Sequence, residues 1–250
     1  MDLGLKDKVA IVTGSARGLG AATARRLAEE GAKVIISDIQ QELAEATAAT
    51  LRADGFAAHC IIADVTKSAD VQRLVDDTIS VFGGVHILVN NAGFPRDGFL
   101  TKMSEEDWDL VVDVALKGAF LTCKAVMPHL IAQKWGRIVN MSSRAYLGNP
   151  GQANYSAAKA GLLGLTRALS LEEGRYNITV NAIAPGFMAT EMIQALPNYE
   201  AIKERAIKAT PLQRTGLPSD IADAVAFLAS ARASFITGET LHVTGGRYGS

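Results

Sequence analysis

The sequence predicts an α/β protein in which a doubly wound parallel sheet of about seven strands carries helices on both faces. Two observations support this prediction. Short apolar runs recur along the 250 residues, and they lack the polar alternation of strands that face water on one side. Longer segments with helical spacing of apolar residues separate these runs, and strand–helix–strand repetition builds a parallel sheet. Because no linker or internal repeat interrupts the pattern, we expect residues 1–250 to form one domain.

Local signals place each element in order. The first strand is the apolar run at 9–13, the first helix stops at Gly31, and the second strand ends at Asp38. Ser104 is expected to cap the long central helix, because acidic residues follow it. The expected strands are 9–13, 34–37, 60–63, 87–90, 137–140, 179–182 and 240–243. The expected helices are 19–30, 41–54, 68–82, 105–127, 152–173 and 219–229. The irregular segment 187–211 is expected to form a lid where open α/β sheets bind ligands.

Charge and composition disfavour several classes of function. The chain has 25 basic and 26 acidic residues, a net charge of −1 and no long run of either sign, so we expect no nucleic-acid or membrane partner. Cys60 and Cys123 form no C-x-x-C motif and are interpreted as buried thiols in a reducing compartment. The four histidines have no metal-ligand spacing, so no metal is expected. Because the N-terminus lacks a secretory pattern, we expect a cytoplasmic protein.

A glycine-rich turn joins the first strand to the first helix. Gly14, Gly18 and Gly20 have the spacing G-x-x-x-G-x-G. Glycines there permit a tight turn and let the backbone approach a pyrophosphate, while the helix N-terminus supplies free N–H groups and a partial positive charge. The strand before the turn and the helix after it favour a dinucleotide site over a simple tight turn.

An acidic residue ends the second strand. The carboxylate of Asp38 can accept hydrogen bonds from both ribose hydroxyls of an adenosine, and it would repel a 2′-phosphate. Arg17 favours the opposite preference, because a guanidinium in the glycine turn could meet a 2′-phosphate. We rank the carboxylate higher, since it would lie against the ribose itself. The sequence therefore predicts NAD(H) over NADP(H).

A phenol and an ammonium are placed one helical turn apart. Tyr155 and Lys159 project from one face of the expected helix. Attraction of roughly 4 kcal/mol at contact could lower a tyrosine pKa by up to about three units, which would make a usable acid/base near neutral pH. Tyr199 and Lys203 repeat the spacing, and we interpret that pair as solvated helix surface. The first pair differs because it follows a strand that ends in serines.

These motifs together resemble the short-chain dehydrogenase/reductase family, almost from end to end. The matching pieces are the glycine turn at 13–20, Asp64-Val65, the NNAG segment 90–93, the serine strand end 140–143, Tyr155 with Lys159, and Pro185-Gly186 with Thr190. The segments 90–97, 148–155 and 236–243 are most similar to 3-oxoacyl-[acyl-carrier-protein] reductases. The resemblance implies a single-domain Rossmann fold. It also implies an oxidoreductase that moves a hydride between a nicotinamide coenzyme, NAD(H) by the argument from Asp38, and an alcohol/ketone or 3-hydroxyacyl/3-oxoacyl substrate.

The resemblance assigns roles to individual residues. Ser143 would bind the substrate oxygen, Tyr155 would exchange the proton, and Lys159 would hold the phenol and the nicotinamide ribose. The implied cofactor-binding residues are Gly14, Ser15, Arg17, Gly18, Leu19, Gly20, Asp38, Ile39, Asp64, Val65, Asn91, Ala92, Gly93, Tyr155, Lys159, Pro185, Gly186, Met188 and Thr190. The implied substrate pocket is lined by Phe94, Tyr146, Phe187 and Met192, for which plain core packing is the alternative. Helices 105–127 and 152–173 would pair between the subunits of a homotetramer.

Two positions depart from the family pattern. Ala115 stands where the family usually has an asparagine that supports a water beside the lysine. The loop before the tyrosine is also one residue short, so alignment from the strand selects Ser143 whereas counting back from Tyr155 selects Ser142. We favour Ser143, because strand register fixes which face a side chain takes. Two alternatives stay open: an NADPH-dependent 3-oxoacyl-[acyl-carrier-protein] reductase, and a weakly active or non-catalytic NAD-binding homologue.

Overall fold

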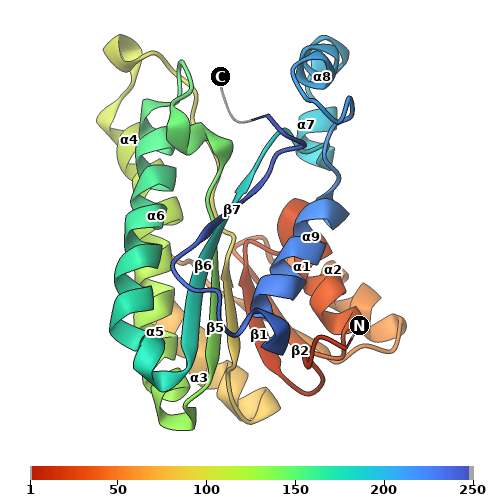
Figure 1. Ribbon diagram of the computed structural model, residues 1–250, viewed down its shortest axis with the longest axis vertical. Coiled ribbons are helices and arrows are strands. Elements are labelled where there is room, and N and C mark those ends of the chain that lie inside the picture. The colour runs from red at the N-terminus through yellow and green to blue at the C-terminus, as the bar shows by residue number, and fades with distance from the viewer. Residues whose placement is uncertain (1, 248–250) are drawn as a thin grey trace.

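The computed structural model describes residues 2–247, apart from the side chain of Met192. Seven parallel strands form one sheet in the order β3-β2-β1-β4-β5-β6-β7 (Figure 1). This confirms the predicted fold class. The strands are β1 (Val9–Thr13), β2 (Lys33–Asp38), β3 (Ala58–Ile62), β4 (Ile87–Asn90), β5 (Gly136–Met141), β6 (Ile178–Pro185) and β7 (Thr240–Val243).

Helices connect the strands as the apolar periodicity predicts. The α-helices are α1 (Gly18–Glu29), α2 (Gln41–Ala53), α3 (Ser68–Phe82), α4 (Glu105–Val112), α5 (Gly118–Gln133), α6 (Ala153–Glu173), α7 (Glu191–Gln194), α8 (Tyr199–Lys208) and α9 (Pro218–Ala229). Short 3₁₀ turns are η1 (Leu100–Lys102), η3 (Arg144–Leu147), η4 (Gly174–Tyr176) and η5 (Ala231–Ala233), and η2 (Asp113–Lys117) is a π-helical turn.

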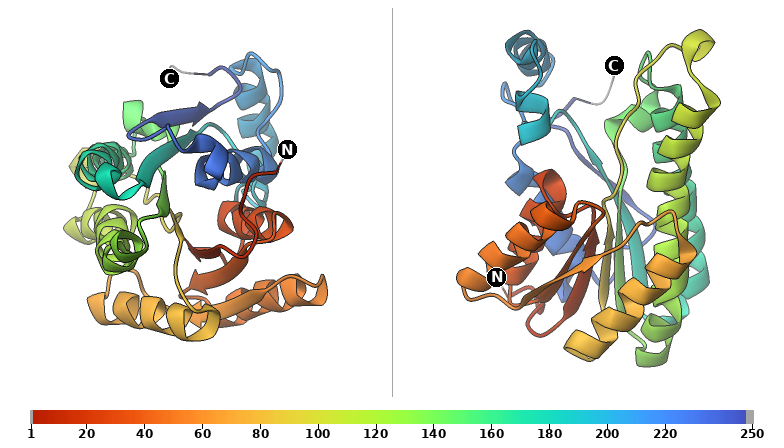
Figure 2. Two further views of the ribbon diagram at one scale, coloured as in Figure 1. Left: turned by 60° about the horizontal axis from the view of Figure 1, so that its bottom comes forward. Right: turned by 180° about the vertical axis from the view of Figure 1, so that it is seen from behind.

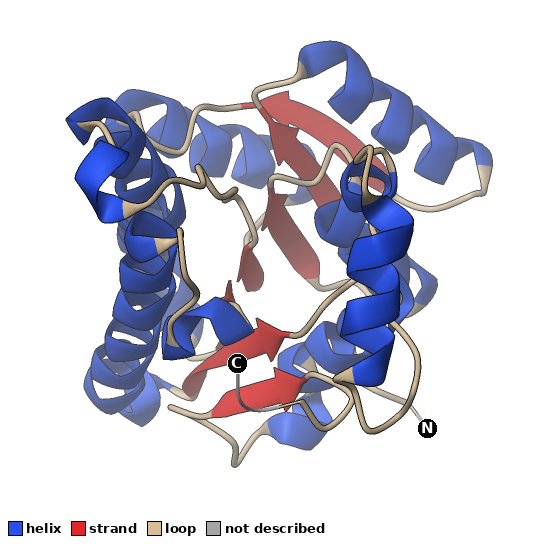
Figure 3. Ribbon diagram, turned by 90° about the horizontal axis from the view of Figure 1, so that it is seen from above, coloured by secondary structure: helices blue, strands red, loops and turns tan. Residues whose placement is uncertain are grey.

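Two apolar cores lie on opposite faces of the sheet. On one face, α1, α2 and α9 contribute residues such as Leu27, Leu51 and Val225. On the other face, α3 and α5 contribute residues such as Leu74 and Val126. Figure 2 and Figure 3 show the strands in the interior with helices around them. Burial on both faces explains why the central strands are continuous apolar runs.

Three expectations about local structure are corrected. The expected helix 105–127 is divided by the π-helical turn η2 and continues past Pro128 to Gln133. The third strand begins at Ala58 and ends at Ile62, rather than spanning 60–63. The last strand is not buried on both faces: Leu241 is exposed, because β7 is an edge of the sheet and has a neighbour on one side only. The lid segment contains two helices, α7 and α8.

The topology brings the loops that follow β1 and β6 to the same side of the sheet, at the carboxyl ends of the strands. The strand order reverses between β1 and β4, and ligands of open α/β sheets bind outside the carboxyl ends of the strands at such a point. The lid leaves the sheet after β6 and is closed at its base. There, Ala189 donates its N–H to the Gly216 carbonyl at 2.9 Å, and Gly216 donates to the Phe187 carbonyl at 3.0 Å.

Candidate active site

The glycine turn lies at the carboxyl end of β1. Gly14 and Gly18 have φ values of 62° and 61°, in the left-handed region that favours glycine. A Cβ at Gly20 would lie 2.3 Å from the Gly14 carbonyl oxygen, so only glycine lets α1 begin this close to the turn. Arg17, the N-cap residue of α1, makes no side-chain capping bond. The first N–H groups of α1 therefore stay available for an anion.

The loop after β4 holds the glycine turn in shape. Asn91 donates from Nδ2 to the carbonyl oxygens of Thr13 and Gly14, at 3.0 and 2.8 Å. The Thr13 hydroxyl accepts hydrogen bonds from the backbone N–H groups of Asn91 and Ala92, both at 3.1 Å. The glycine spacing in the sequence does not predict this role for Thr13, because its hydroxyl meets the loop after β4 only in the folded protein. Asn91 and Ala92 thus shape the turn.

Asp38 and Ser15 have different roles beside the turn. One carboxylate oxygen of Asp38 accepts from the Ala16 N–H at 3.2 Å, and the other accepts from the Gln40 N–H at 3.1 Å. A carboxylate offers about four acceptor positions, so two remain for ribose hydroxyls. The Ser15 hydroxyl, in contrast, is fully buried and donates to the Val12 carbonyl at 2.6 Å. The side chain of Ser15 is therefore structural, and its backbone N–H also bonds within the protein, to the Ser37 carbonyl at 3.2 Å.

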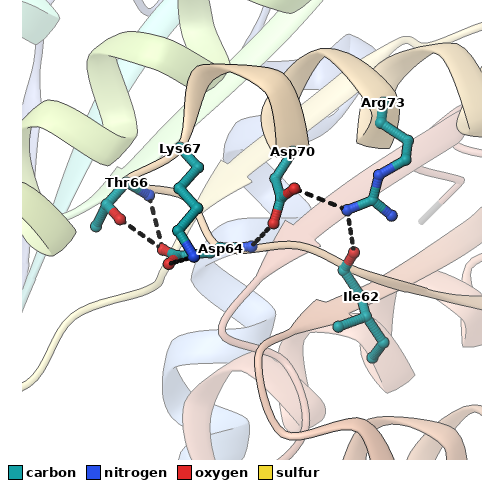
Figure 4. A network of polar contacts seen from close by, with 6 residues as sticks. All are labelled: Ile62, Asp64, Thr66, Lys67, Asp70 and Arg73. Carbon is teal, nitrogen blue, oxygen red and sulfur yellow. Dashed lines mark hydrogen bonds and ion pairs between the residues drawn. The ribbon is translucent and has the colours of Figure 1, made fainter.

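A polar network surrounds Asp64 at the end of β3 (Figure 4). Its carboxylate accepts from the Thr66 N–H at 3.0 Å and from the Thr66 hydroxyl at 2.7 Å, and it pairs with Lys67 at 3.3 Å. Burial alone would raise the pKa of Asp64, but the bonds from Thr66 and Lys67 outweigh burial and the pKa lies below its usual range. The backbone N–H of Asp64 donates to Asp70, which is itself paired with Arg73.

The network around Asp64 also fixes the position of the next residue, Val65. Val65 is buried, and a Cβ at Gly118 would lie 2.8 Å from its Cγ2 atom. Val65 is therefore held against the start of α5. Asp38 is the last residue of β2, and Asp64 lies two residues past the end of the neighbouring strand β3. The expected position of an adenosine lies over these strand ends.

Three side chains meet between the end of β5 and the start of α6. Lys159 is almost fully buried, and its Nζ lies 5.4 Å from the centre of the Tyr155 ring. The ammonium donates to the Met141 carbonyl at 2.6 Å. Ser143 makes a side-chain hydrogen bond with Tyr155, whereas the buried Ser142 hydroxyl donates to the Lys159 carbonyl at 2.8 Å. The structure therefore brings Ser143, and not Ser142, to the phenol.

The protonation of this pair differs from the sequence-based expectation. Burial raises the pKa of Tyr155 to about 12, despite the hydrogen bond from Ser143 that lowers it. Burial also lowers the pKa of Lys159 to about 8. The phenol of the protein alone therefore has a raised pKa and not the lowered one that was expected, because the loss of water around it outweighs the bond from Ser143. Spacing along a helix does not reveal this loss of water.

Ala115 lies beside the ammonium of Lys159. A Cβ at Gly93 would lie 3.2 Å from Lys159 Nζ and 3.3 Å from the Ala115 Cβ, so all three residues surround one point. Ala115 is buried at the centre of the π-helical turn η2. Its methyl group cannot hydrogen-bond, so the polar contact that the structure gives Lys159 Nζ here is the Met141 carbonyl.

The expected lining of the substrate pocket is only partly brought together. Phe94 is half-buried, with the Arg96 guanidinium 5.7 Å from its ring centre. Phe187 lines a cavity of about 280 Å³ with Leu212 and His242. The Tyr146 hydroxyl is bonded to His242 Nε2 at 2.9 Å, so Tyr146 contributes a fixed polar group as well as an apolar ring. Met192 has its side chain outside the described part of the structure.

Residues after β6 complete the site from the lid side. Gly186 donates to the Val243 carbonyl at 2.9 Å, and a Cβ there would lie 2.9 Å from Thr244 Cα. The Thr190 methyl lies 4.0 Å from the position of a Cβ on Gly18, so the lid base reaches the glycine turn. The side chain of Met188 belongs to the apolar core and packs on Gly216.

Within residues 2–247, histidine, cysteine and acidic side chains form no group of three that could hold a metal ion. In the same range, every helix is too short or too polar to cross a membrane.

The glycine turn, the acidic strand ends and the Ser143–Tyr155–Lys159 cluster define a dinucleotide-dependent oxidoreductase. A family model described as enoyl-(acyl carrier protein) reductase matches residues 14–247, and the chain belongs to this family of short-chain dehydrogenases/reductases. Enzymes of this kind act on CH–OH and oxo groups.

Relatives and solved structures cover nearly the whole chain. The chain is 47% identical over 245 residues to a (2S)-[(R)-hydroxy(phenyl)methyl]succinyl-CoA dehydrogenase subunit of Thauera aromatica, covering 98% of each chain. It is 43% identical to a 3-oxoacyl-[acyl-carrier-protein] reductase of Staphylococcus epidermidis, covering 97% of this chain and 99% of the relative. A gluconate 5-dehydrogenase of Burkholderia cenocepacia, solved with NADP and tartrate, has a TM-score of 0.93 at 38% identity and covers 98% of this chain and 96% of its own.

Proposed function

We propose that this chain is an NAD(H)-dependent enzyme that interconverts an alcohol and a ketone, or a 3-hydroxyacyl and a 3-oxoacyl group, with Tyr155 as acid/base. The meeting of Ser143, Tyr155 and Lys159 beside the glycine turn carries this proposal. Ser143 would hydrogen-bond the substrate oxygen. Tyr155 would give that oxygen a proton during reduction and remove it during oxidation. Lys159 would hold the phenol and a ribose.

The residues present fit a dinucleotide. The space that a Cβ would fill at Gly20 and at Gly14 is closed by backbone, so the turn exposes its N–H groups to a pyrophosphate. Asp38 and Asp64 would hold the adenosine end, and Gly186 and Thr190 would lie at the nicotinamide end. When bound, NAD(H) supplies the hydride carrier and, when oxidised, a positive charge that favours the phenolate.

The choice of NAD(H) rests on Asp38. Its carboxylate ends β2 beside the glycine turn, and a 2′-phosphate there would meet a like charge. Two findings favour the other coenzyme: Arg17 is exposed in the same turn, and the gluconate 5-dehydrogenase was solved with NADP. A second candidate is therefore an NADPH-dependent 3-oxoacyl-[acyl-carrier-protein] reductase. Initial rates with NADH and NADPH, read at 340 nm over a panel of ketones and 3-oxoacyl thioesters, decide between them; NADPH rates equal to or above NADH rates reject our choice.

Substitution of Tyr155 tests the reaction chemistry. Tyr155→Phe removes one hydroxyl, so coenzyme binding should stay within about twofold while turnover falls by at least about 100-fold. Tyr199→Phe is a matched control, because Lys203 Nζ lies 5.5 Å from the Tyr199 ring on the lid helix α8 with the same sequence spacing. Substantial residual turnover in Tyr155→Phe would refute the role of Tyr155. Coenzyme binding without turnover in the unmodified protein would favour the non-catalytic alternative.

We also propose a cytoplasmic homotetramer. Figure 1 shows the helices α5 and α6 side by side on one flank of the protein. Large apolar side chains on both helices are exposed. Phe120 is 46% exposed and Leu171 is 81% exposed, and a second copy of each helix pair would cover them. Sedimentation velocity should give a tetramer in the unmodified protein and smaller species in Leu171→Glu. A monomer alone would reject the assembly.

A further inference from the structure

Two loops are joined by hydrogen bonds immediately before Tyr155, and we call this junction the entrance strap. Its outer part pairs residues 97–98 of the loop after β4 with residues 149–152 of the loop before α6. Gln152 donates from Nε2 to Asp97 at 2.9 Å, and its Oε1 accepts from Asn149 at 2.8 Å. Gly98 donates its N–H to the Gly151 carbonyl at 2.8 Å. The strap thus joins the loop after β4 to the loop before α6, and Gln152 lies three residues before Tyr155 in sequence.

The inner part of the strap is a buried amide. Asn154 is fully buried and donates from Nδ2 to the carbonyl oxygens of Arg96 and Asp107, both at 3.1 Å. Its Oδ1 accepts from the Tyr155 N–H at 2.7 Å. One side chain therefore binds the loop after β4, the first turn of α4 and the residue that carries the phenol. Because every polar group of Asn154 is satisfied inside the protein, this end of α6 is held rigidly.

The surroundings of the Tyr155 phenol are mostly apolar. Val111 and Ala115, from α4 and the π-helical turn, form the apolar cluster against which it packs. The charged groups that the structure places by the phenol are Lys159, one helical turn away on α6, and Asp97, on the loop after β4. Burial is the main cause of the raised pKa of Tyr155, the bond from Ser143 acts against it, and the negative charge of Asp97 adds to it.

We propose that Asp97 is a positioning residue for Tyr155: its bond to Gln152 closes the entrance strap and so fixes the start of α6, which carries the phenol. This inference rests on the proposed function, because it concerns the acid/base of that reaction. The negative charge of Asp97 has a separate effect, because it disfavours phenolate whichever way the reaction runs. The bond, in contrast, fixes where the phenol lies and needs only an acceptor at position 97, not a charge.

Substitutions at position 97 separate the two effects. Asp97→Asn removes the charge and keeps an oxygen that accepts from Gln152, so the plateau kcat should stay within about twofold. The limb of the pH–rate profile that reports Tyr155 should move to lower pH by about half a unit, since Asp97 is exposed and its charge is screened. Asp97→Ala should show the same movement and also a lower plateau kcat with little change in the KM of the coenzyme. The movement should shrink in high salt.

Asp109→Asn is the matched control, because Asp109 is an exposed carboxylate of α4 outside the strap and the change in net charge is the same. The proposal is overturned if the plateau kcat values of Asp97→Ala and Asp97→Asn are equal. The separate effect of the charge is refuted if Asp97→Asn leaves the profile in place, or if Asp109→Asn moves it equally. A lack of turnover in the unmodified protein would instead refute the proposed function itself.

Discussion

Replacing Gly20 by alanine tests whether the glycine turn is a binding site that depends on close backbone approach. The added Cβ would lie 2.3 Å from the Gly14 carbonyl oxygen and 2.6 Å from Asn91 Nδ2, and neither atom is the free end of a flexible chain. Relief of the clash requires a shift of about 1 Å in the turn, and overpacking of this kind costs about 1–3 kcal/mol. Displacement of the Asn91 amide from the Gly14 carbonyl would cost about a further 1 kcal/mol.

The two costs together amount to about 2–4 kcal/mol. This corresponds to a fall in Tm of roughly 5–15 °C for a domain of this size, and to a coenzyme Kd weakened by about 30-fold or more if the strain is relieved by moving the turn. Thermal unfolding and fluorescence titration with NADH measure the two quantities. Gly174→Ala is the control, since a Cβ there meets no atom within 4 Å and the backbone is helical. Unchanged Tm and Kd in Gly20→Ala would refute the account of the turn.

Four further predictions concern single residues. Asp38→Asn removes the charge at the ribose, so the ratio of NADPH to NADH turnover should rise at least about tenfold; an unchanged ratio would assign coenzyme choice to another residue. Ser143→Ala should lower kcat about 10- to 100-fold and more than Ser142→Ala does, and the reverse order would move the substrate contact to Ser142. Ala115→Asn should raise kcat by placing an amide beside Lys159, and an unchanged kcat would show that the Met141 carbonyl or water suffices. Burial, with Lys8 and Lys33, lowers the pKa of His86, so the folded protein binds fewer protons than the unfolded chain; stability should fall as pH drops below about 6.5, and less steeply in His86→Gln.

Periodicity and turn signals are enough to predict the central framework. The strands at 9–13, 87–90 and 240–243 and the helix at 68–82 have the expected bounds, because each is a short apolar run or a single amphipathic pattern between clear breakers. The division of the central helix, in contrast, is not predictable from these patterns. The π-helical turn at Asp113–Lys117 leaves the apolar pattern intact, and Pro128 lies within α5 although proline often ends a helix.

The candidate site is predictable in its members but not in its electrostatics. Motif spacing identifies Tyr155 and Lys159, and strand register favours Ser143, because each depends on local geometry. The direction of the pKa shift of Tyr155 depends on burial by α4 and the π-helical turn, which are distant in sequence. For the same reason, spacing gives no role to Asp97 or Asn154, whose partners lie on other loops.

The closed base of the lid has a consequence for how the substrate specificity of such an enzyme can change. Backbone hydrogen bonds between Ala189, Gly216 and Phe187 join the two ends of the lid segment. The length of the segment between them can therefore change without moving the strands. Insertions, deletions or a transplanted sequence in α8, farther from these anchors than Thr190, would change the lid while leaving Thr190 and the glycine turn in place. Exchange of this one segment could therefore give a new substrate specificity while Ser143, Tyr155 and Lys159 stay as they are.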